Sequence, residues 1–108
     1  KNTLYDPLNV QIMIRTFVKQ GLTNFDLKII DMEKGGYKNY TYSFLNKEEC
    51  YFDKQKYECL IYERTQANSK RKVTYYLVKE LEFMFLKIID VSPERVNKLE
   101  LKEILSFG

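Results

Sequence analysis

Two different secondary structures fit residues 23–34, which read TNFDLKIIDMEK, and the fold of the chain depends on which one forms. As a helix, the segment begins with Thr23 and Asp26 at the spacing of a capping box. Apolar side chains then recur near one helical face, at Phe25, Ile29 and Met32. The pair Gly35-Gly36 would end such a helix, since glycine readily adopts the left-handed conformation that closes the last turn.

The same segment also alternates between apolar and polar side chains, as a strand with one buried face does. The alternating residues are Phe25, Asp26, Leu27, Lys28 and Ile29. In this case Gly35-Gly36 turns the chain into a second strand over residues 37–45. That strand would carry Tyr40, Tyr42 and Phe44 on one face. The sequence leaves both structures open for this segment.

The N-terminal segment carries the clearest helix signals. Asp6 can cap the helix, Pro7 suits its first position and Gly21 suits the stop that follows it. Between them, the apolar residues at helical spacing are Leu8, Ile12, Met13, Phe17 and Val18. We therefore expect an amphipathic helix over residues 7–20.

A long hairpin is predicted in the second half of the chain. Residues 57–64 and 72–78 are rich in tyrosine and aliphatic side chains, which favour strands. The connection over residues 65–71 is polar and contains neither glycine nor proline, so we expect it to project as a tip. The alternative is one continuous helix from Val73, because the apolar residues from there to Ile88 also fit helical spacing.

Two helices are expected after the hairpin. Apolar residues between Leu81 and Ile89 suit a buried helix. Ser92 can cap a further helix with Pro93 at its first position. Its apolar side would consist of Val96, Leu99, Ile104 and Leu105. We therefore predict a single α+β domain over residues 1–108, with an N-terminal helix, an antiparallel hairpin or sheet and two C-terminal helices. The alternative architecture is a helix-flanked antiparallel sheet.

The residue types that are missing exclude several kinds of site. The chain has no histidine, so a Ser-His-Asp triad, a Cys-His pair and imidazole ligation of a metal are excluded within it. Its four glycines lack the spacing of a phosphate-binding loop. The tight acidic clusters, Glu48 with Glu49 and Asp31 with Glu33, are typical of solvated faces, which makes a hydrolase that uses carboxylates alone the weakest hypothesis. We expect no enzymatic activity, no cofactor and no bound metal.

The apolar runs and the two cysteines bear on location. No apolar run reaches the ~20 residues that a membrane-spanning helix needs, so we expect no membrane partner. The N-terminus shows no apolar leader. Cys50 and Cys59 could form a disulfide in a secreted protein, but without a leader we expect free thiols and a cytoplasmic location.

Basic residues gather around the expected hairpin tip. Residues 64–79 contain five lysines and arginines and no acidic residue, although the net charge of the chain is only +3. Four of these residues are the candidate nucleic-acid-binding residues, because clustered cations attract the phosphates of a nucleic-acid backbone. They are Arg64, Lys70, Arg71 and Lys72. The same charges can instead keep an exposed hairpin from pairing with other chains.

The hairpin region also carries an ordered set of motifs. A Leu-Ile pair, an arginine, a basic tip and a Tyr-x-Leu strand occur as Leu60-Ile61, Arg64, Arg71-Lys72-Val73 and Tyr75-Tyr76-Leu77. Upstream, Gly21-Leu22 is followed by Leu27 and Ile30 at helix-turn-helix spacing. In this order, residues 7–90 resemble winged helix-turn-helix DNA-binding regulators. The sequence departs from them at Cys59, where glycine is usual, and in residues 23–34, whose acidic side chains are unfavourable beside DNA.

That resemblance implies a small regulatory protein that contacts the DNA backbone through its basic hairpin. In this hypothesis the C-terminal helices form a homodimer seam of Phe83, Phe85, Leu99 and Leu105. The alternative is a protein-binding inhibitor or adaptor of the kind that viruses and mobile elements encode, because nine tyrosines and seven phenylalanines suit a protein interface. Its docking surface would be residues 37–44 or the basic hairpin. A strand at residues 23–34 would favour this alternative.

Overall fold

A computed structural model describes residues 4–5, 7–31, 33–93 and 96–100 of the chain. Within these residues the secondary structure consists of one α-helix, seven strands and a short 3-10 helix. In chain order these are β1 (Leu4–Tyr5), α1 (Pro7–Lys19), β2 (Asn24–Ile30), β3 (Tyr37–Phe52), β4 (Gln55–Thr65), β5 (Lys72–Val78), η1 (Lys79–Leu81), β6 (Met84–Val91) and β7 (Val96–Glu100).

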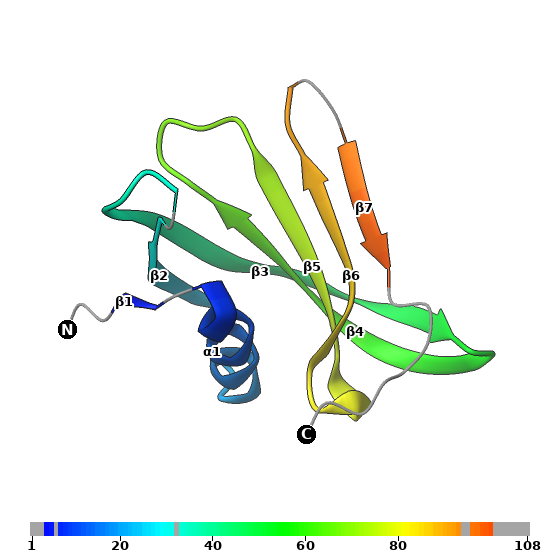
Figure 1. The fold of residues 1–108 in the computed structure, drawn as a ribbon. Coiled ribbons are helices and arrows are strands. Elements are labelled where there is room, and N and C mark those ends of the chain that lie inside the picture. Colours follow the sequence, from blue (N-terminus) through cyan, green and yellow to red (C-terminus); the bar gives the residue numbers. More distant parts are fainter. Residues whose placement is uncertain (1–3, 6, 32, 94–95, 101–108) are drawn as a thin grey trace.

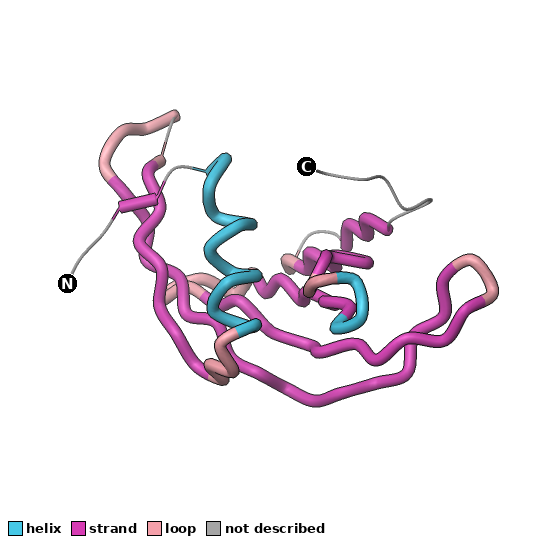
Figure 2. Tube along the Cα trace, turned by 90° about the horizontal axis from the view of Figure 1, so that it is seen from below, coloured by secondary structure: helices cyan, strands magenta, loops and turns pink. Residues whose placement is uncertain are grey.

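The seven described strands form one sheet whose spatial order is the sequence order, from β1 to β7. β1 pairs in parallel with β2, and every later pair is antiparallel. The sheet curves around α1, which lies on its concave face (Figure 2). Register shifts in β3 and between β5 and β6 add to this curvature, since a bulge bends its strand. The paired ends of β3 and β4 extend beyond the neighbouring strands (Figure 1).

The ambiguous segment 23–34 contains a strand, β2, and not a helix. It pairs with β3 so that Leu27 faces Tyr40, and both side chains are buried beneath α1. Asp26, by contrast, is exposed on the convex face. The alternation of apolar and polar side chains therefore outweighs the helical spacing, because β3 offers a matching apolar face. The helical alternative for this segment is wrong, and with it the expected winged-helix-like fold.

The two predicted C-terminal helices are also absent from the described residues. After η1, Glu82 and Phe83 take left-handed backbone conformations, with φ angles of 55° and 59°, and reverse the chain into β6. β6 and β7 then continue the antiparallel sheet. The apolar run fits helical spacing because β5 and β6 contribute apolar side chains to buried groups on both faces of the sheet. These strands therefore lack the regular alternation of apolar and polar residues that would have indicated a strand.

The expected homodimer seam loses its basis with those helices. Phe83 and Phe85 pack against the core inside the chain. Leu99 lies in β7, opposite Ile88. Leu105, like the other residues after position 100, lies outside the described residues.

The predicted N-terminal helix is confirmed as α1. It ends before Gly21, whose φ of 84° is left-handed, and the Leu22 amide donates a hydrogen bond back to the Phe17 carbonyl. Two guanidinium nitrogens of Arg15, Nε and Nη2, donate to the Glu82 carbonyl oxygen at 3.2 and 2.8 Å. This contact links α1 to the connection between β5 and β6. Asp6, the expected cap, lies outside the described residues.

Two groups of buried side chains stabilise the sheet. The larger group lies between α1 and the concave face and consists of Ile14, Val18, Leu27, Ile29, Tyr40, Tyr42, Tyr62, Val73, Tyr75 and Leu77. The smaller group consists of Cys50, Cys59, Val78 and Leu86. Strand alternation places Cys59 on the opposite face from Leu60 and Tyr62, so this group packs on the convex face.

Cys50 and Cys59 form a disulfide, with their Cα atoms 5.9 Å apart. The expectation of free thiols is therefore wrong. The cause is the strand register: Cys50 lies opposite Tyr57 and Cys59 opposite Glu48, which makes the two cysteines diagonal neighbours on one face of β3 and β4. That register could not be fixed from the sequence alone.

Two buried tyrosines should respond in opposite directions to loss of their hydroxyl groups. The Tyr42 side chain is fully buried, and its hydroxyl lies close to Arg64 and Tyr75 without forming a hydrogen bond of good distance and angle to a described residue. The Tyr62 hydroxyl donates to the Leu22 carbonyl oxygen at 2.6 Å. An unsatisfied buried hydroxyl is costly, so Tyr42→Phe should raise the free energy of unfolding by about 1 kcal/mol, and Tyr62→Phe should lower it by about 1 kcal/mol.

Urea denaturation of both variants, followed by circular dichroism, checks this pair. Because each variant removes one oxygen from a buried ring, each serves as the control for the other. Destabilisation by Tyr42→Phe equal to that by Tyr62→Phe would show that the Tyr42 hydroxyl has a partner in solution.

Candidate functional site

The structure confirms the predicted hairpin of β4 and β5 but separates its four basic residues. Lys70 and Lys72 are exposed at the tip. Arg71 forms an ion pair with Asp90 of β6. Arg64 is half-buried and lines a cavity on the concave face. The four side chains therefore do not form one continuous basic surface.

Arg71 connects the hairpin tip to β6. Its Nε donates to Asp90 Oδ1 at 2.8 Å, and its Nη2 pairs with Oδ2. The hydrogen bond to Asp90 raises the pKa of the Arg71 guanidinium, although partial burial opposes this. Because its charge is already paired in a bidentate contact, Arg71 offers less attraction to a phosphate than a free arginine would.

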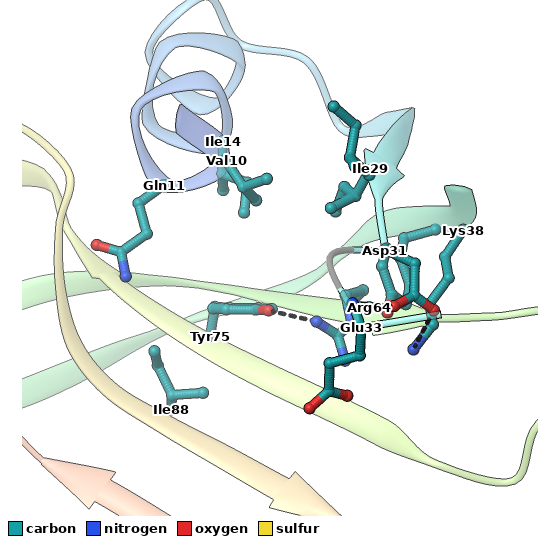
Figure 3. A pocket seen from close by; sticks show the side chains of 12 residues that line it. Val10, Gln11, Ile14, Ile29, Asp31, Glu33, Lys38, Arg64, Tyr75 and Ile88 are labelled. Atoms are coloured by element: carbon teal, nitrogen blue, oxygen red, sulfur yellow. Dashed lines mark hydrogen bonds and ion pairs between the residues drawn. The ribbon is translucent and has the colours of Figure 1, made fainter. Parts of the chain in front are cut away.

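A cavity of about 390 Å³ lies between α1 and the concave face of the sheet. Its size falls within the range of small-molecule sites in proteins. Figure 3 shows the side chains that line it, which come from α1, from strands β2 to β6 and from the connection between β2 and β3. The apolar ones are Val10, Ile14, Ile29, Ile30 and Ile88, and the aromatic ones are Tyr40 and Tyr75. The polar ones are Gln11, Asp31, Glu33, Lys38 and Arg64.

Arg64 is held in this cavity by two tyrosines. Its guanidinium carbon lies 4.2 Å from the centre of the Tyr40 ring, and its Nη1 donates to the Tyr75 hydroxyl at 3.3 Å (Figure 3). Among the described residues, no carboxylate lies within ion-pair distance of Arg64. The cation–π contact and the hydroxyl contact orient the guanidinium, and neither supplies a negative charge to it.

The other charged side chains that line the cavity are one lysine, which is paired with an aspartate, and one further carboxylate. Lys38 Nζ lies 3.8 Å from Asp31 Oδ2. Glu33 adds a further carboxylate to the lining. Asp31 Oδ1 also accepts the backbone N–H groups of Glu33 and Lys34, each at 3.0 Å. These two hydrogen bonds are the main reason that the pKa of Asp31 lies below its usual 3.8, with Lys38 adding to the shift.

The lowered pKa of Asp31 predicts a pH-dependent contribution to stability. Folding favours the charged carboxylate, so this contribution is present above the unfolded pKa and is lost as the pH falls through the lower folded pKa. We therefore expect Asp31→Ala to destabilise the protein near pH 6, and the difference from the unsubstituted protein to narrow between about pH 4 and pH 2.

Urea denaturation at several pH values measures that difference. Asp31→Asn is the matched control, because it keeps an acceptor oxygen for the two backbone N–H groups and removes only the charge. A difference that stays constant with pH would contradict a role for the ionised carboxylate.

The tyrosine hydroxyls near Arg64 stay protonated at neutral pH. Burial raises the pKa of the Tyr42 phenol, and the neighbouring Tyr75 raises it further. Burial likewise raises the pKa of the Tyr75 phenol, and the Arg64 guanidinium opposes both shifts. Tyr75 can therefore accept a hydrogen bond from Arg64 and still donate its own proton to a ligand.

The sequence predicts Arg64 as a contact for a nucleic-acid backbone, and the structure places this residue in the lining of the cavity beneath α1. In β4, Arg64 alternates with Glu63 and shares the concave face with Tyr62. An arginine on the apolar face of an expected strand was the signal that could have indicated a site beneath the helix. Its partner Tyr40 could not be found in this way, because that contact depends on the pairing of β3 with β4.

Residues 37–44 were one of the two surfaces expected to bind a protein target, but most of their tyrosines are buried in the core. Tyr40 and Tyr42 of the expected docking segment are buried, whereas Tyr37 is half-exposed beneath Lys28. Tyr51, near the end of the β3–β4 hairpin, is exposed. Binding of a protein target stays a prediction.

The acidic clusters form simple ion pairs. Glu49 pairs with Lys56 at 3.2 Å, and Asp31 pairs with Lys38. Across the described ranges, no three or more acidic or cysteine side chains gather in a way that could hold a metal ion. None of the helices in these ranges is long and apolar enough to cross a membrane.

Comparisons with known proteins give no relative for this chain. No family model matches the sequence, and neither a curated protein nor a solved structure is significantly similar to it. The function must therefore be argued from the site itself.

Proposed function

We propose that this chain is a binding protein that holds a small organic anion against Arg64, in the cavity between α1 and the sheet. The observation that carries the proposal is the half-buried guanidinium, which faces the cavity and has no carboxylate partner in the described part of the chain. The proposed role is binding, because the side chains in contact with Arg64 are the Tyr40 ring and the Tyr75 hydroxyl, which position its charge toward the cavity.

The energetics of Arg64 support an anionic ligand. A guanidinium that is partly removed from water loses hydration, and the Tyr40 ring and the Tyr75 hydroxyl replace only part of it. An anion in the cavity would supply the missing charge-assisted hydrogen bonds, which contribute about 1.5 to 3 kcal/mol each. The cavity walls would at the same time remove apolar surface of the ligand from water.

Arg64→Gln tests this function. We expect the unsubstituted protein to bind anilinonaphthalene sulfonate, a fluorescent aromatic anion, and the variant to bind it at least about tenfold more weakly, a loss of about 1.4 kcal/mol. Fluorescence titration measures both affinities. Lys70→Gln is the matched control, because it removes the same charge from the exposed tip and should leave the affinity unchanged. Equal affinity of Arg64→Gln and the unsubstituted protein would contradict the proposal.

A second candidate function is contact with a nucleic-acid backbone. It is favoured by the exposure of Lys70 and Lys72, which have no ion-pair partner among the described residues. Duplex binding should then weaken with salt, and the Lys70→Gln/Lys72→Gln variant should reduce the logarithmic salt slope by about 1.8 units. Arg71→Gln should change this slope less, because Asp90 already pairs with Arg71. Absence of duplex binding at low salt would exclude this candidate.

The disulfide supports an oxidising compartment as the place of this function. Structural disulfides persist in oxidising surroundings and are rare where thiol reductants are abundant. Cys50 and Cys59 are both buried, which protects the bond from reductants. We therefore propose such a compartment in place of the cytoplasm predicted from the sequence.

A further inference from the structure

We propose that the ligand of the cavity is a monocarboxylate with a hydrocarbon chain. This inference rests on the proposed function and names the chemical class that the same site selects. It follows from the number of unpaired charges, from the shape of the cationic group and from the walls of the cavity.

The charges around the cavity suit a single negative charge. Among the described lining residues the other cation is Lys38, which is paired with Asp31. Arg71, at the hairpin tip, is paired with Asp90. Glu33 contributes another negative charge to the lining. A dianionic group such as a phosphate monoester would meet one free guanidinium and two nearby carboxylates, which repel it. A monoanion needs only Arg64.

The shape of the cationic group suits a planar acid. The guanidinium is a flat fork whose central carbon lies over the Tyr40 ring, and all of its N–H groups lie in one plane. A carboxylate matches that plane with two parallel hydrogen bonds. The Tyr75 hydroxyl accepts from Arg64 and keeps its proton for a carboxylate oxygen.

The walls of the cavity suit a hydrocarbon chain. Val10 and Ile14 of α1 face Ile29 and Ile88 of the sheet across it (Figure 3). The branched side chains offer no hydrogen bonds, and Gln11 is the single uncharged amide in the lining. Hydroxyl groups of a sugar placed against these aliphatic walls would therefore lose hydration without replacement there. An alkyl chain would gain burial along the same walls.

The experiment compares ligands that share a chain but differ in the head group. Decanoate, decanol and decyl phosphate are titrated, below their micelle-forming concentrations, against the protein loaded with anilinonaphthalene sulfonate. We expect decanoate to displace the dye at least tenfold more tightly than either of the other two, and acetate not to displace it.

The outcomes distinguish failure of the inference from failure of the proposed function. If decanol binds as well as decanoate, the charge is not recognised, and both the inference and the proposed anion binding fail. If decyl phosphate binds as well or better, the class is wrong while anion binding stands. If neither the dye nor any chain compound binds, the proposed function and the inference fail together.

Two aspartate variants on one helix test the hydrocarbon wall. Val10 lines the cavity, whereas Ile12 is 60% exposed on the other side of α1. We expect Val10→Asp to weaken decanoate binding at least tenfold and Ile12→Asp to leave it unchanged. Circular dichroism and thermal unfolding of both variants show that α1 stays folded. Equal decanoate affinities for the two folded variants would overturn the assignment of the chain to this wall.

Discussion

Replacing both cysteines by alanine should lower the free energy of unfolding by about 2.5 kcal/mol. The disulfide joins residues nine positions apart, and closure of a loop of this length restricts the unfolded chain by about that amount. For a domain of this size the melting temperature should fall by about 10 to 20 °C. The small cavities left beside Val78 and Leu86 would add to the loss.

Urea denaturation of the oxidised protein and of Cys50→Ala/Cys59→Ala measures this effect. The control is the same pair of experiments with a reductant, which should destabilise only the protein that has the disulfide. Coincident unfolding midpoints for the oxidised protein and the variant would show that the cross-link does not stabilise the fold.

Ile14→Ala should lower the free energy of unfolding by about 3 to 4 kcal/mol. The Ile14 side chain is 1% exposed and packs between α1 and the sheet, so its truncation loses burial and leaves a void. Ile12→Ala is the control on the same helix. Its side chain is 60% exposed, and its replacement should change stability by less than about 0.5 kcal/mol.

Chemical denaturation followed by tyrosine fluorescence compares the two variants. Equal losses in the free energy of unfolding for Ile14→Ala and Ile12→Ala would mean that α1 does not pack on the concave face through Ile14. The Ile14 variant also enlarges the cavity, so ligand affinity should be measured separately from stability.

Local signals in the sequence were sufficient for α1 and for the hairpin of β4 and β5. Pro7 and Gly21 act on the chain within one or two turns, so the helix bounds did not depend on distant contacts. The tyrosine-rich strands on either side of the polar tip were similarly local. Both elements are therefore present where they were predicted.

The errors arose where the tertiary structure determines the local one. Residues 23–34 fit two periodicities, and only a partner strand in β3 favours one of them. The apolar run after Leu81 resembled a helix because β6 is covered on both faces. The disulfide and the cavity depend on strand register, which a single sequence does not reveal, so the residues that surround Arg64 could not be identified from the sequence.

The contact between Arg15 and Glu82 has a consequence for the order in which the chain folds. From β2 to β7, neighbouring strands of the sheet are consecutive in sequence and antiparallel, so each of these pairs can form by closing a short connection. The helix instead meets a carbonyl group that lies 67 residues away in sequence. That contact can form only after the turn before β6 exists. We therefore expect α1 to dock late, with loss of the Arg15 contact accelerating unfolding while refolding keeps its rate.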